Sequence, residues 1–248
     1  MPYLLLLLFP FGTRAQVAYS GAGAQEAIAV GDFRLAAAIL DSLETVGEVS
    51  PNFYLTQGNA HFEAGEPGRA ILAYERGLRL RPGHQDLQNN LRYVRREAGI
   101  TDLDIPDFFL IRAWRSVGAF LGTTTLFTVS ILCWWLAVTG VVWWYLRKEN
   151  MEEKRRFALL PTALGFGLLS LLLFALGHSR SDYLARSDEA ILLEEATLRV
   201  SPTAEGSVEA QLTEGVRLYI TDRVNQYVKV QLADGKTGYL PADRIGTI

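Results

Sequence analysis

The sequence predicts a multidomain membrane protein with an all-α repeat domain, a two-helix transmembrane hairpin and a small all-β barrel. Three observations predict this fold class. Apolar residues gather in long uncharged blocks, a 34-residue period runs through residues 22–100, and residues 190–248 alternate between apolar and polar side chains. The formal net charge of the 248 residues is −3. It gives no reason to expect nucleic acid as a partner, because nucleic-acid binding usually needs a basic face.

A short apolar block, Tyr3–Phe11, lies at the start of the chain and is too short to span a bilayer. Thr13 and Ala15 follow it and fit the small-residue rule for cleavage before Gln16. Residues 1–15 are therefore predicted to be a secretory signal peptide, although no Lys or Arg precedes the apolar core. The alternative is an uncleaved anchor.

The period in residues 22–100 is typical of stacked helix–turn–helix repeats. Its best copy lies between Pro51 and His84, where small residues let two helices touch and aromatic residues fill the space beside them. The positions that carry this pattern are Tyr54, Gly58, Ala70, Tyr74 and Pro82. The copy resembles the tetratricopeptide repeat family, and the resemblance implies an all-α domain of stacked hairpins.

Stacked repeats present the first helix of each pair on a concave face. Helical spacing predicts that this face carries a set of candidate ligand-binding residues. They are Asn52, Asn59, Phe62, Asn89, Tyr93 and Arg96. Asparagine and arginine side chains suit a peptide backbone or a carboxylate. The alternative is that these polar residues form an ordinary solvated helix face.

Residues 107–120 mix aromatic and aliphatic side chains with two arginines, which predicts an interfacial helix with Trp114 at headgroup depth. Residues 121–146 and 157–177 contain no charged residue. Each is long enough to cross a hydrocarbon core of about 30 Å, so they are predicted to be two transmembrane helices.

The second predicted span carries Pro161 near its start, where the missing N–H of proline costs least. Pairs of small residues at four-residue spacing, Gly118 with Gly122 and Ala163 with Gly167, allow helices to approach closely. We expect these pairs to pack the hairpin rather than to form an oligomer.

Residues 147–156 join the two spans, and five of these ten residues are Lys or Arg. Short basic loops lie on the cytoplasmic side of a membrane. The loop is therefore predicted to be cytoplasmic, with both termini and both larger domains on the opposite side. The predicted signal peptide gives the same orientation.

Residues 190–248 have the strand pattern of a small barrel with about five strands. Residues 216–220 and 227–232 alternate apolar and polar side chains, and Asp234-Gly235 predicts a tight hairpin turn. With the segments 198–202 and 234–240, this order resembles the bacterial SH3-like family, whose members bind peptides or cell-wall material. The resemblance implies three candidate ligand-binding aromatics. They are Tyr219, Tyr227 and Tyr239. Core packing is the alternative for at least two of them.

The sequence gives little support for catalysis. The three histidines lie in separate contexts, and Cys133, the one cysteine, lies in an apolar span without an ionisable partner. Neither a metal-ligand cluster nor a phosphate-binding glycine loop is present in the sequence. We therefore predict a non-enzymatic protein without a cofactor, in which Cys133 is a packing residue.

The complete order of signal peptide, repeats, two spans with a basic loop, and SH3-like barrel resembles the BatE-type family of the Bacteroides aerotolerance operon. The resemblance implies a Gram-negative inner membrane, von Willebrand A-type and other Bat-type partner proteins, and a role in stress or oxygen tolerance. The resulting hypothesis is a periplasmic scaffold. The alternative is a peptidoglycan-binding anchor that recruits a wall enzyme, and a cytoplasmic signalling adaptor conflicts with the predicted orientation.

Overall fold

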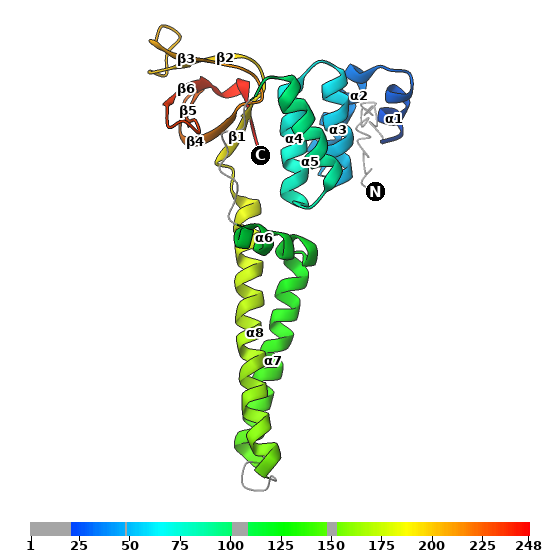
Figure 1. The fold of residues 1–248 in the computed structure, drawn as a ribbon, viewed down its shortest axis with the longest axis vertical. Helices are drawn as coiled ribbons and strands as arrows, with labels where there is room; N and C mark the ends of the chain where they lie inside the picture. Colours follow the sequence, from blue (N-terminus) through cyan, green and yellow to red (C-terminus); the bar gives the residue numbers. More distant parts are fainter. Residues whose placement is uncertain (1–20, 48, 101–108, 148–152) are drawn as a thin grey trace, which may run out of the picture.

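The computed structural model describes residues 21–47, 49–100, 109–147 and 153–248. The predicted signal peptide and the centre of the predicted cytoplasmic loop lie outside the described residues. Two long helices form a stalk, a shorter helix crosses one end of it, and a helical domain and a β-domain lie side by side beyond that end (Figure 1).

Five helices joined by short turns form the helical domain. They are α1 (Gly21–Ala29), α2 (Phe33–Val46), α3 (Pro51–Glu63), α4 (Pro67–Leu80) and α5 (Gln85–Glu97). The turns after α1, α3 and α5 contain Gly31, Gly65 and Gly99, with φ angles of 80°, 82° and 65°. A left-handed turn glycine therefore recurs at the period seen in the sequence, at positions where other residues would be strained.

Helices α3 and α4 approach each other closely at Gly58. A Cβ atom added to Gly58 would stand 2.3 Å from Cε1 of Tyr74, so a larger residue cannot fit there without moving the ring. Tyr74 is 1% exposed, and its hydroxyl donates a hydrogen bond to Oδ1 of Asn59 at 2.8 Å. The predicted contact between a small and an aromatic residue is confirmed.

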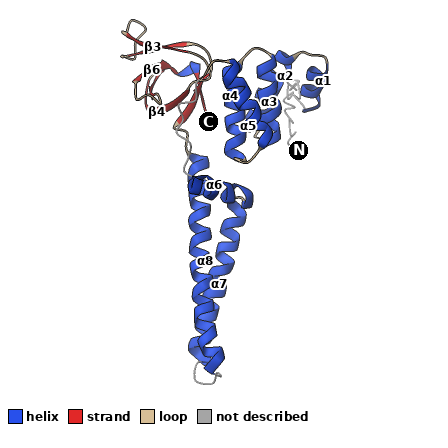
Figure 2. Ribbon diagram, viewed as in Figure 1, coloured by secondary structure: helices blue, strands red, loops and turns tan. Residues whose placement is uncertain are grey.

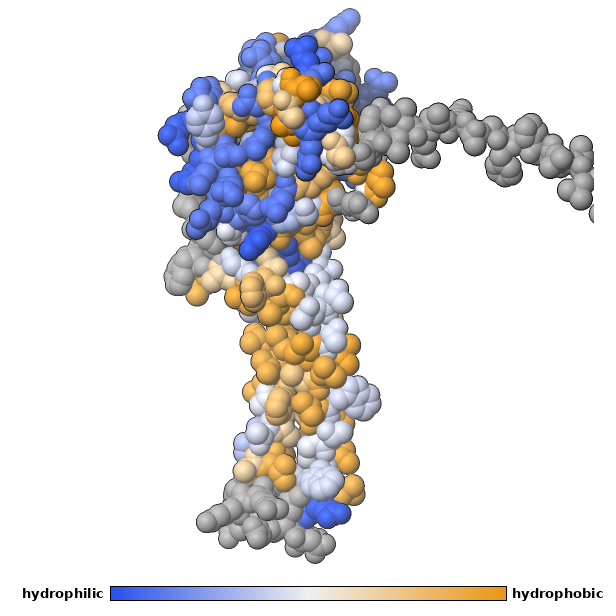
Figure 3. All heavy atoms as spheres, turned by 90° about the vertical axis from the view of Figure 1, so that its right-hand side faces the viewer, coloured by the Kyte–Doolittle hydropathy of each residue, from blue (hydrophilic) through white to orange (hydrophobic). Residues whose placement is uncertain are grey.

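The stalk consists of α7 (Thr123–Arg147) and α8 (Glu153–Ala185), and α6 (Phe109–Leu121) crosses its upper end. Segments Thr123–Arg147 and Ala158–Ala185 are long and apolar enough to cross a membrane. Figure 3 shows hydrophobic side chains along the stalk and hydrophilic ones over much of the visible face of the domains. An exposed apolar surface of this extent is typical of contact with lipid.

Small and hydroxyl side chains hold the two stalk helices together. Ser130 and Ser170 each donate a hydrogen bond to the other residue's carbonyl oxygen, at 3.0 and 2.8 Å. A Cβ atom on Gly140 would stand 3.0 Å from the methyl group of Ala163, and one on Gly167 would stand 3.8 Å from that of Ala137. One of the predicted small-residue pairs thus packs within the hairpin, where Cys133 is also buried.

Helix α8 differs from the second predicted span at both of its ends. It begins at Glu153, so Pro161 lies inside the helix rather than near its start. It also continues past Gly177 to Ala185 and carries Arg180 and Tyr183 out of the apolar stalk. The first charged residues after Gly177 show where the apolar run ends, but they do not end the helix. A helix can continue with polar residues beyond an apolar run.

The β-domain contains seven strands rather than the five predicted. They are β1 (Glu189–Leu192), β2 (Ala196–Arg199), β3 (Val208–Leu212), β4 (Arg217–Val224), β5 (Tyr227–Gln231), β6 (Thr237–Pro241) and β7 (Ile245–Thr247). A 3-10 turn, Ala242–Arg244, precedes β7. The antiparallel sheet has the order β3-β2-β6-β5-β4-β1-β7. Figure 2 shows the strands in red beside the blue helices of the helical domain. The predicted Asp234-Gly235 hairpin joins β5 and β6, with a φ of 87° at Gly235.

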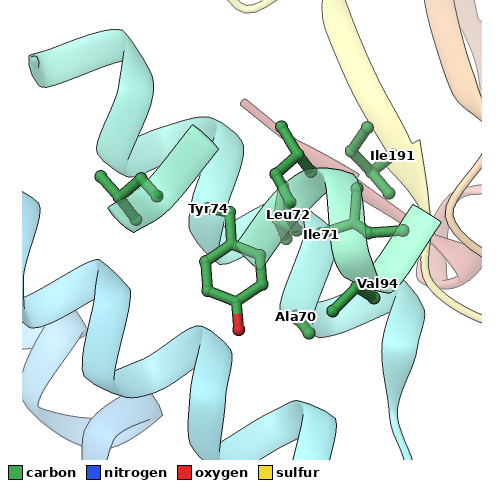
Figure 4. Close-up of a cluster of buried hydrophobic side chains, with 8 residues drawn as sticks. Ala70, Ile71, Leu72, Tyr74, Val94 and Ile191 are labelled. Atoms are coloured by element: carbon green, nitrogen blue, oxygen red, sulfur yellow. The ribbon is translucent and has the colours of Figure 1, made fainter. Parts of the chain in front are cut away.

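Strand β1 contributes to the cores of both domains. Ala190 and Leu192 belong to the buried cluster inside the β-domain. Ile191 points the opposite way and is fully buried among residues of α4 and α5, including Ile71 and Val94 (Figure 4). Burial on both faces removes the alternating pattern from this strand, which is why the sequence did not reveal it.

Two glycines allow the domains to approach each other. A Cβ atom on Gly68, in the first turn of α4, would stand 2.6 Å from the carbonyl oxygen of Leu193. A Cβ atom on Gly246, in β7, would stand 2.3 Å from Cδ2 of Leu72. The helical domain and the β-domain therefore dock through α4, β1 and β7 as one body.

Candidate ligand-binding surfaces

The strand register places the three candidate tyrosines on one face of the sheet. Tyr219 of β4 pairs with Gln231 of β5, and Tyr239 of β6 pairs with Lys229 of β5. Gln231, Lys229 and Tyr227 occupy alternate positions along β5 and so point to the same side. We call Tyr219, Tyr227 and Tyr239 the tyrosine face.

The tyrosine face lies opposite the core of the β-domain. Tyr219 is 36% exposed, and Tyr227 and Tyr239 are half-buried. The core cluster on the other side contains Ala190, Leu192, Leu198, Leu212, Leu218, Val228, Val230 and Leu240. The three rings therefore lie where a ligand reaches them, and Lys229 beside them adds a positive charge. Their role in ligand binding stays a prediction.

Three of the predicted groove residues come together between α3 and α5. The rings of Phe62 and Tyr93 meet edge to face, with centroids 5.7 Å apart, and Tyr93 is 53% exposed. Asn59 lies on the same helix as Phe62, but its Oδ1 already accepts hydrogen bonds from Tyr74 and from Nδ2 of Asn90, both at 2.8 Å. The aromatic pair is thus the part of this face that is better placed for a ligand.

The other three predicted groove residues are exposed and do not join that aromatic pair in a contact. Oδ1 of Asn52 lies 3.0 Å from Nε2 of His84, which links the start of α3 to the start of α5. Asn89 accepts a hydrogen bond from Nη2 of Arg92 at 2.6 Å. Arg96 lies exposed near the end of α5. Asn52 and Asn89 thus take part in local hydrogen bonds of the helical domain.

A buried histidine connects α2, α3 and the turn before α4, and the sequence did not identify it. His61 is 4% exposed, with Nε2 2.9 Å from Asp41 and Nδ1 2.8 Å from Glu66. Two ionised carboxylates only accept hydrogen bonds, so the geometry favours the doubly protonated imidazolium. Burial alone lowers the pKa of His61, but the hydrogen bonds and charges of both carboxylates outweigh it and raise the pKa.

Charged side chains also connect the two domains. Glu75 of α4 is 9% exposed and accepts a hydrogen bond from Nη2 of Arg95 at 2.6 Å and another from Nη2 of Arg217 in β4. Arg217 also pairs with Glu189 at 3.2 Å. Arg76 donates from Nε and Nη2 to the carbonyl oxygen of Thr247, at 3.0 and 2.7 Å. Helical spacing indicates that Glu75 lies on the buried face of α4. It does not indicate that Arg217 is the partner.

Within the part of the chain that the structure describes, no group of three or more His, Cys, Asp or Glu residues could hold a metal ion. The candidate surfaces described above carry aromatic rings, amides and guanidinium groups, which are suited to reversible contacts.

The family model of the bacterial SH3 domain matches residues 194–245. No curated protein and no solved structure matches the chain. The matched segment runs from the end of β1 to the start of β7 and contains the whole tyrosine face. The β-domain is therefore similar to bacterial SH3 domains, and this similarity supports a role in binding protein or cell wall.

Proposed function

We propose that this protein is a membrane-anchored, non-enzymatic adaptor whose two docked domains bind protein partners outside the cytoplasm. The observation that carries the proposal is the construction of the two domains as one body with exposed aromatic surfaces. The tyrosine face lies on the β-domain and the Phe62–Tyr93 pair lies on the helical domain. A rigid body that presents two aromatic surfaces holds two partner segments at a fixed separation.

The orientation in this proposal follows the charge distribution around the stalk. The basic loop, residues 147–156, is the cytoplasmic end, and the opposite end carries both domains. A bacterial SH3 domain fits a periplasmic location.

The recurrence of the turn glycines and the Gly58–Tyr74 contact support a tetratricopeptide-type repeat in the helical domain. Together with the order of domains, they support a place in a Bat-type complex of the inner membrane, with von Willebrand A-type proteins among the partners. In that setting the adaptor would serve stress or oxygen tolerance by assembly and not by a reaction of its own.

Co-purification of the full chain from its native membrane, after gentle solubilisation, tests this function. We expect companion proteins with the wild type and a loss of about tenfold or more when Phe62 and Tyr93 are both replaced by alanine. Arg92→Ala, on the same helix as Tyr93, is the matched control, because its hydrogen bonds among the described residues go to Gln88 and Asn89 of its own helix. A chain that purifies without companions in every case would contradict the proposal.

The SH3 similarity and the tyrosine face favour a second candidate, which is binding of peptidoglycan. Aromatic rings next to polar side chains are suited to sugar and peptide ligands. The full chain in detergent would then be retained by purified cell-wall sacculi, and a variant with Tyr219, Tyr227 and Tyr239 replaced by alanine would not be. If neither protein is retained, peptidoglycan binding is excluded, and the adaptor proposal is unaffected. The full chain is needed, because an isolated β-domain would expose Ile191 to water.

A further inference from the structure

Three arginines from three different helices surround one tyrosine where α8 emerges from the stalk. The guanidinium carbons of Arg79 in α4, Arg115 in α6 and Arg180 in α8 lie 5.2, 4.8 and 5.8 Å from the ring centroid of Tyr183. Cations attract the face of an aromatic ring but repel each other. Positive charge is therefore concentrated around this ring, and Glu75 and Glu189, which line a cavity together with Arg79 and Arg115, balance part of it.

Two of these arginines donate hydrogen bonds to backbone oxygens of the described residues. Arg180 donates from Nη2 to the carbonyl oxygen of Leu80 at 2.9 Å. Arg79 donates to the carbonyl oxygens of Tyr183 and Arg186 and to a backbone oxygen of Ile248. The carbonyl oxygen of Leu80 satisfies an N–H group of Arg180, but it does not neutralise the charge of that guanidinium.

Arg180 is also incompletely hydrogen-bonded. Its residue is 7% exposed, and its Nη1 is buried without a hydrogen-bond partner in the part of the chain that is described. A buried cationic N–H group without an acceptor costs more than a neutral one, so an anionic acceptor at this point would be strongly favoured.

A cavity of about 150 Å³ lies beside Arg180, between α6 and α8. It is lined by Ile111, Trp114, Arg115, Gly118, Leu176, Ser179, Arg180, Tyr183 and Arg186. This lining combines apolar residues with three arginines and contains no Asp or Glu. A neighbouring cavity of about 200 Å³ shares Arg115 and Tyr183, but it also contains Glu75 and Glu189, which pair with Arg217. An anion is therefore favoured in the first cavity.

We propose that the cavity between α6 and α8 binds the phosphate group of an anionic membrane phospholipid. Nη1 of Arg180, which has no hydrogen-bond partner among the described residues, can donate to a phosphate oxygen, and Ser179 and Arg186 lie at the same cavity. Ile111, Trp114 and Leu176 line it with apolar surface, which suits the glycerol and upper acyl region of a lipid. This inference rests on the membrane location in the proposed function, but it does not depend on any protein partner.

The position of the cavity favours a lipid over a phosphate ion from solution. Helix α6 crosses the upper end of the apolar stalk (Figure 1), which is the depth of phospholipid headgroups if the stalk spans the bilayer. Trp114 donates a hydrogen bond from Nε1 to Oγ of Ser179 at 3.3 Å and so fixes α6 against α8 at this depth. The bound lipid would connect the stalk to the base of the helical domain, because Arg180 also contacts Leu80 of α4.

Native mass spectrometry and thermal unfolding of the full chain in mild detergent test this inference. The probes are phosphatidylglycerol, phosphatidylcholine and inorganic phosphate. We expect phosphatidylglycerol to bind the wild type and raise its unfolding temperature, with about tenfold weaker binding to the Arg180→Gln variant. The control is Arg92→Gln, an exposed arginine on α5, which should bind like the wild type.

A second variant guards against a folding defect in the first. Gly118→Leu places an apolar side chain at the cavity and keeps all of its arginines; a Cβ atom there would lie 3.4 Å from Cδ1 of Leu176 and 3.7 Å from Cβ of Arg180, which are ordinary contact distances. It should also lose the lipid. Equal lipid binding by wild type, Arg180→Gln and Gly118→Leu would overturn the site. Equal binding of phosphatidylcholine, or an equal temperature shift with inorganic phosphate, would overturn its assignment to an anionic lipid.

The same experiment separates this inference from the adaptor function. Loss of lipid without loss of companion proteins in the Arg180→Gln variant supports the lipid site as an independent feature. A chain that is extracted from membranes by alkaline carbonate would contradict the membrane anchor itself, and the lipid site with it.

Discussion

The two sides of the β-domain have opposite surroundings, although both belong to one small sheet. On the side of β1 and β7, Ile191 is fully buried against the helical domain and Gly246 makes room for Leu72. On the face of β4, β5 and β6, Tyr219, Tyr227 and Tyr239 each lie next to a core residue of the same strand, and Tyr219 is 36% exposed. The difference shows that one side of the sheet holds the protein together and the other side is available to a ligand.

The largest loss of stability should follow from a charge placed on the side of the sheet that packs against the helical domain. Ile191→Asp puts a carboxylate among Ile71, Leu72 and Val94, and an uncompensated buried charge costs roughly 3–5 kcal/mol. Thermal and urea unfolding of the full chain would measure this loss. Tyr219→Asp, on the exposed side, is the control and should cost clearly less, because a carboxylate there stays in contact with water. Equal losses in both variants would contradict the contrast between the two sides.

A smaller effect should follow from removing the charge that links the domains. Glu75→Gln leaves Arg95 and Arg217 without their shared carboxylate, and hydrogen bonds to charged groups contribute about 1.5–3 kcal/mol. We expect a loss of about 2 kcal/mol and faster protease cleavage between the domains. Glu63→Gln, an exposed glutamate on α3, should be close to neutral. A neutral Glu75→Gln variant would show that apolar packing alone maintains the docking.

The smallest expected effect is a dependence of folding stability on pH, which arises in the helical domain. The pKa of His61 is raised, so its ion pairs stabilise the fold fully below the ordinary value of 6.5, and this stability is lost as the pH rises through the raised pKa. Burial raises the pKa of Asp41, but its hydrogen bonds to His61 and Gln57 outweigh burial and lower it, so its contribution is lost only in acid.

Unfolding curves between pH 5 and 9 should therefore show a decline for the wild type that His61→Gln lacks. Replacing Tyr219 with phenylalanine on the β-domain should leave the decline unchanged. A His61→Gln variant with the same pH dependence as the wild type would assign the decline to another group.

Sequence reasoning predicted the elements whose pattern is local. The Gly58–Tyr74 contact, the Asp234-Gly235 hairpin and the apolar helices all follow from short-range patterns in the sequence. The docking of the two domains could not be predicted from the sequence. Ile191 and Glu75 contact residues of the other domain, which lie far away in the sequence.

The same distinction applies to the candidate sites. The common face of the three tyrosines could be predicted, because side chains alternate along each strand. The hydrogen bonds of Asn59 could not, because they come from Tyr74 and Asn90 on two other helices. The cluster around Tyr183 was also missed. It combines arginines from α4, α6 and α8, and α8 extends beyond the apolar run that marked the span.

The central claim is that the two domains form one docked body outside the cytoplasm with an exposed tyrosine face. Labelling of single cysteines in cells tests this claim most directly. Three variants in a Cys133→Ser background would be treated with a maleimide that does not cross the inner membrane. They are Tyr219→Cys, Ile191→Cys and Lys148→Cys. We predict labelling of the Tyr219→Cys variant in intact cells, of the Ile191→Cys variant only after denaturation, and of the Lys148→Cys variant only after permeabilisation. Equal labelling of the first two would contradict the docking, and labelling of the third in intact cells would contradict the orientation.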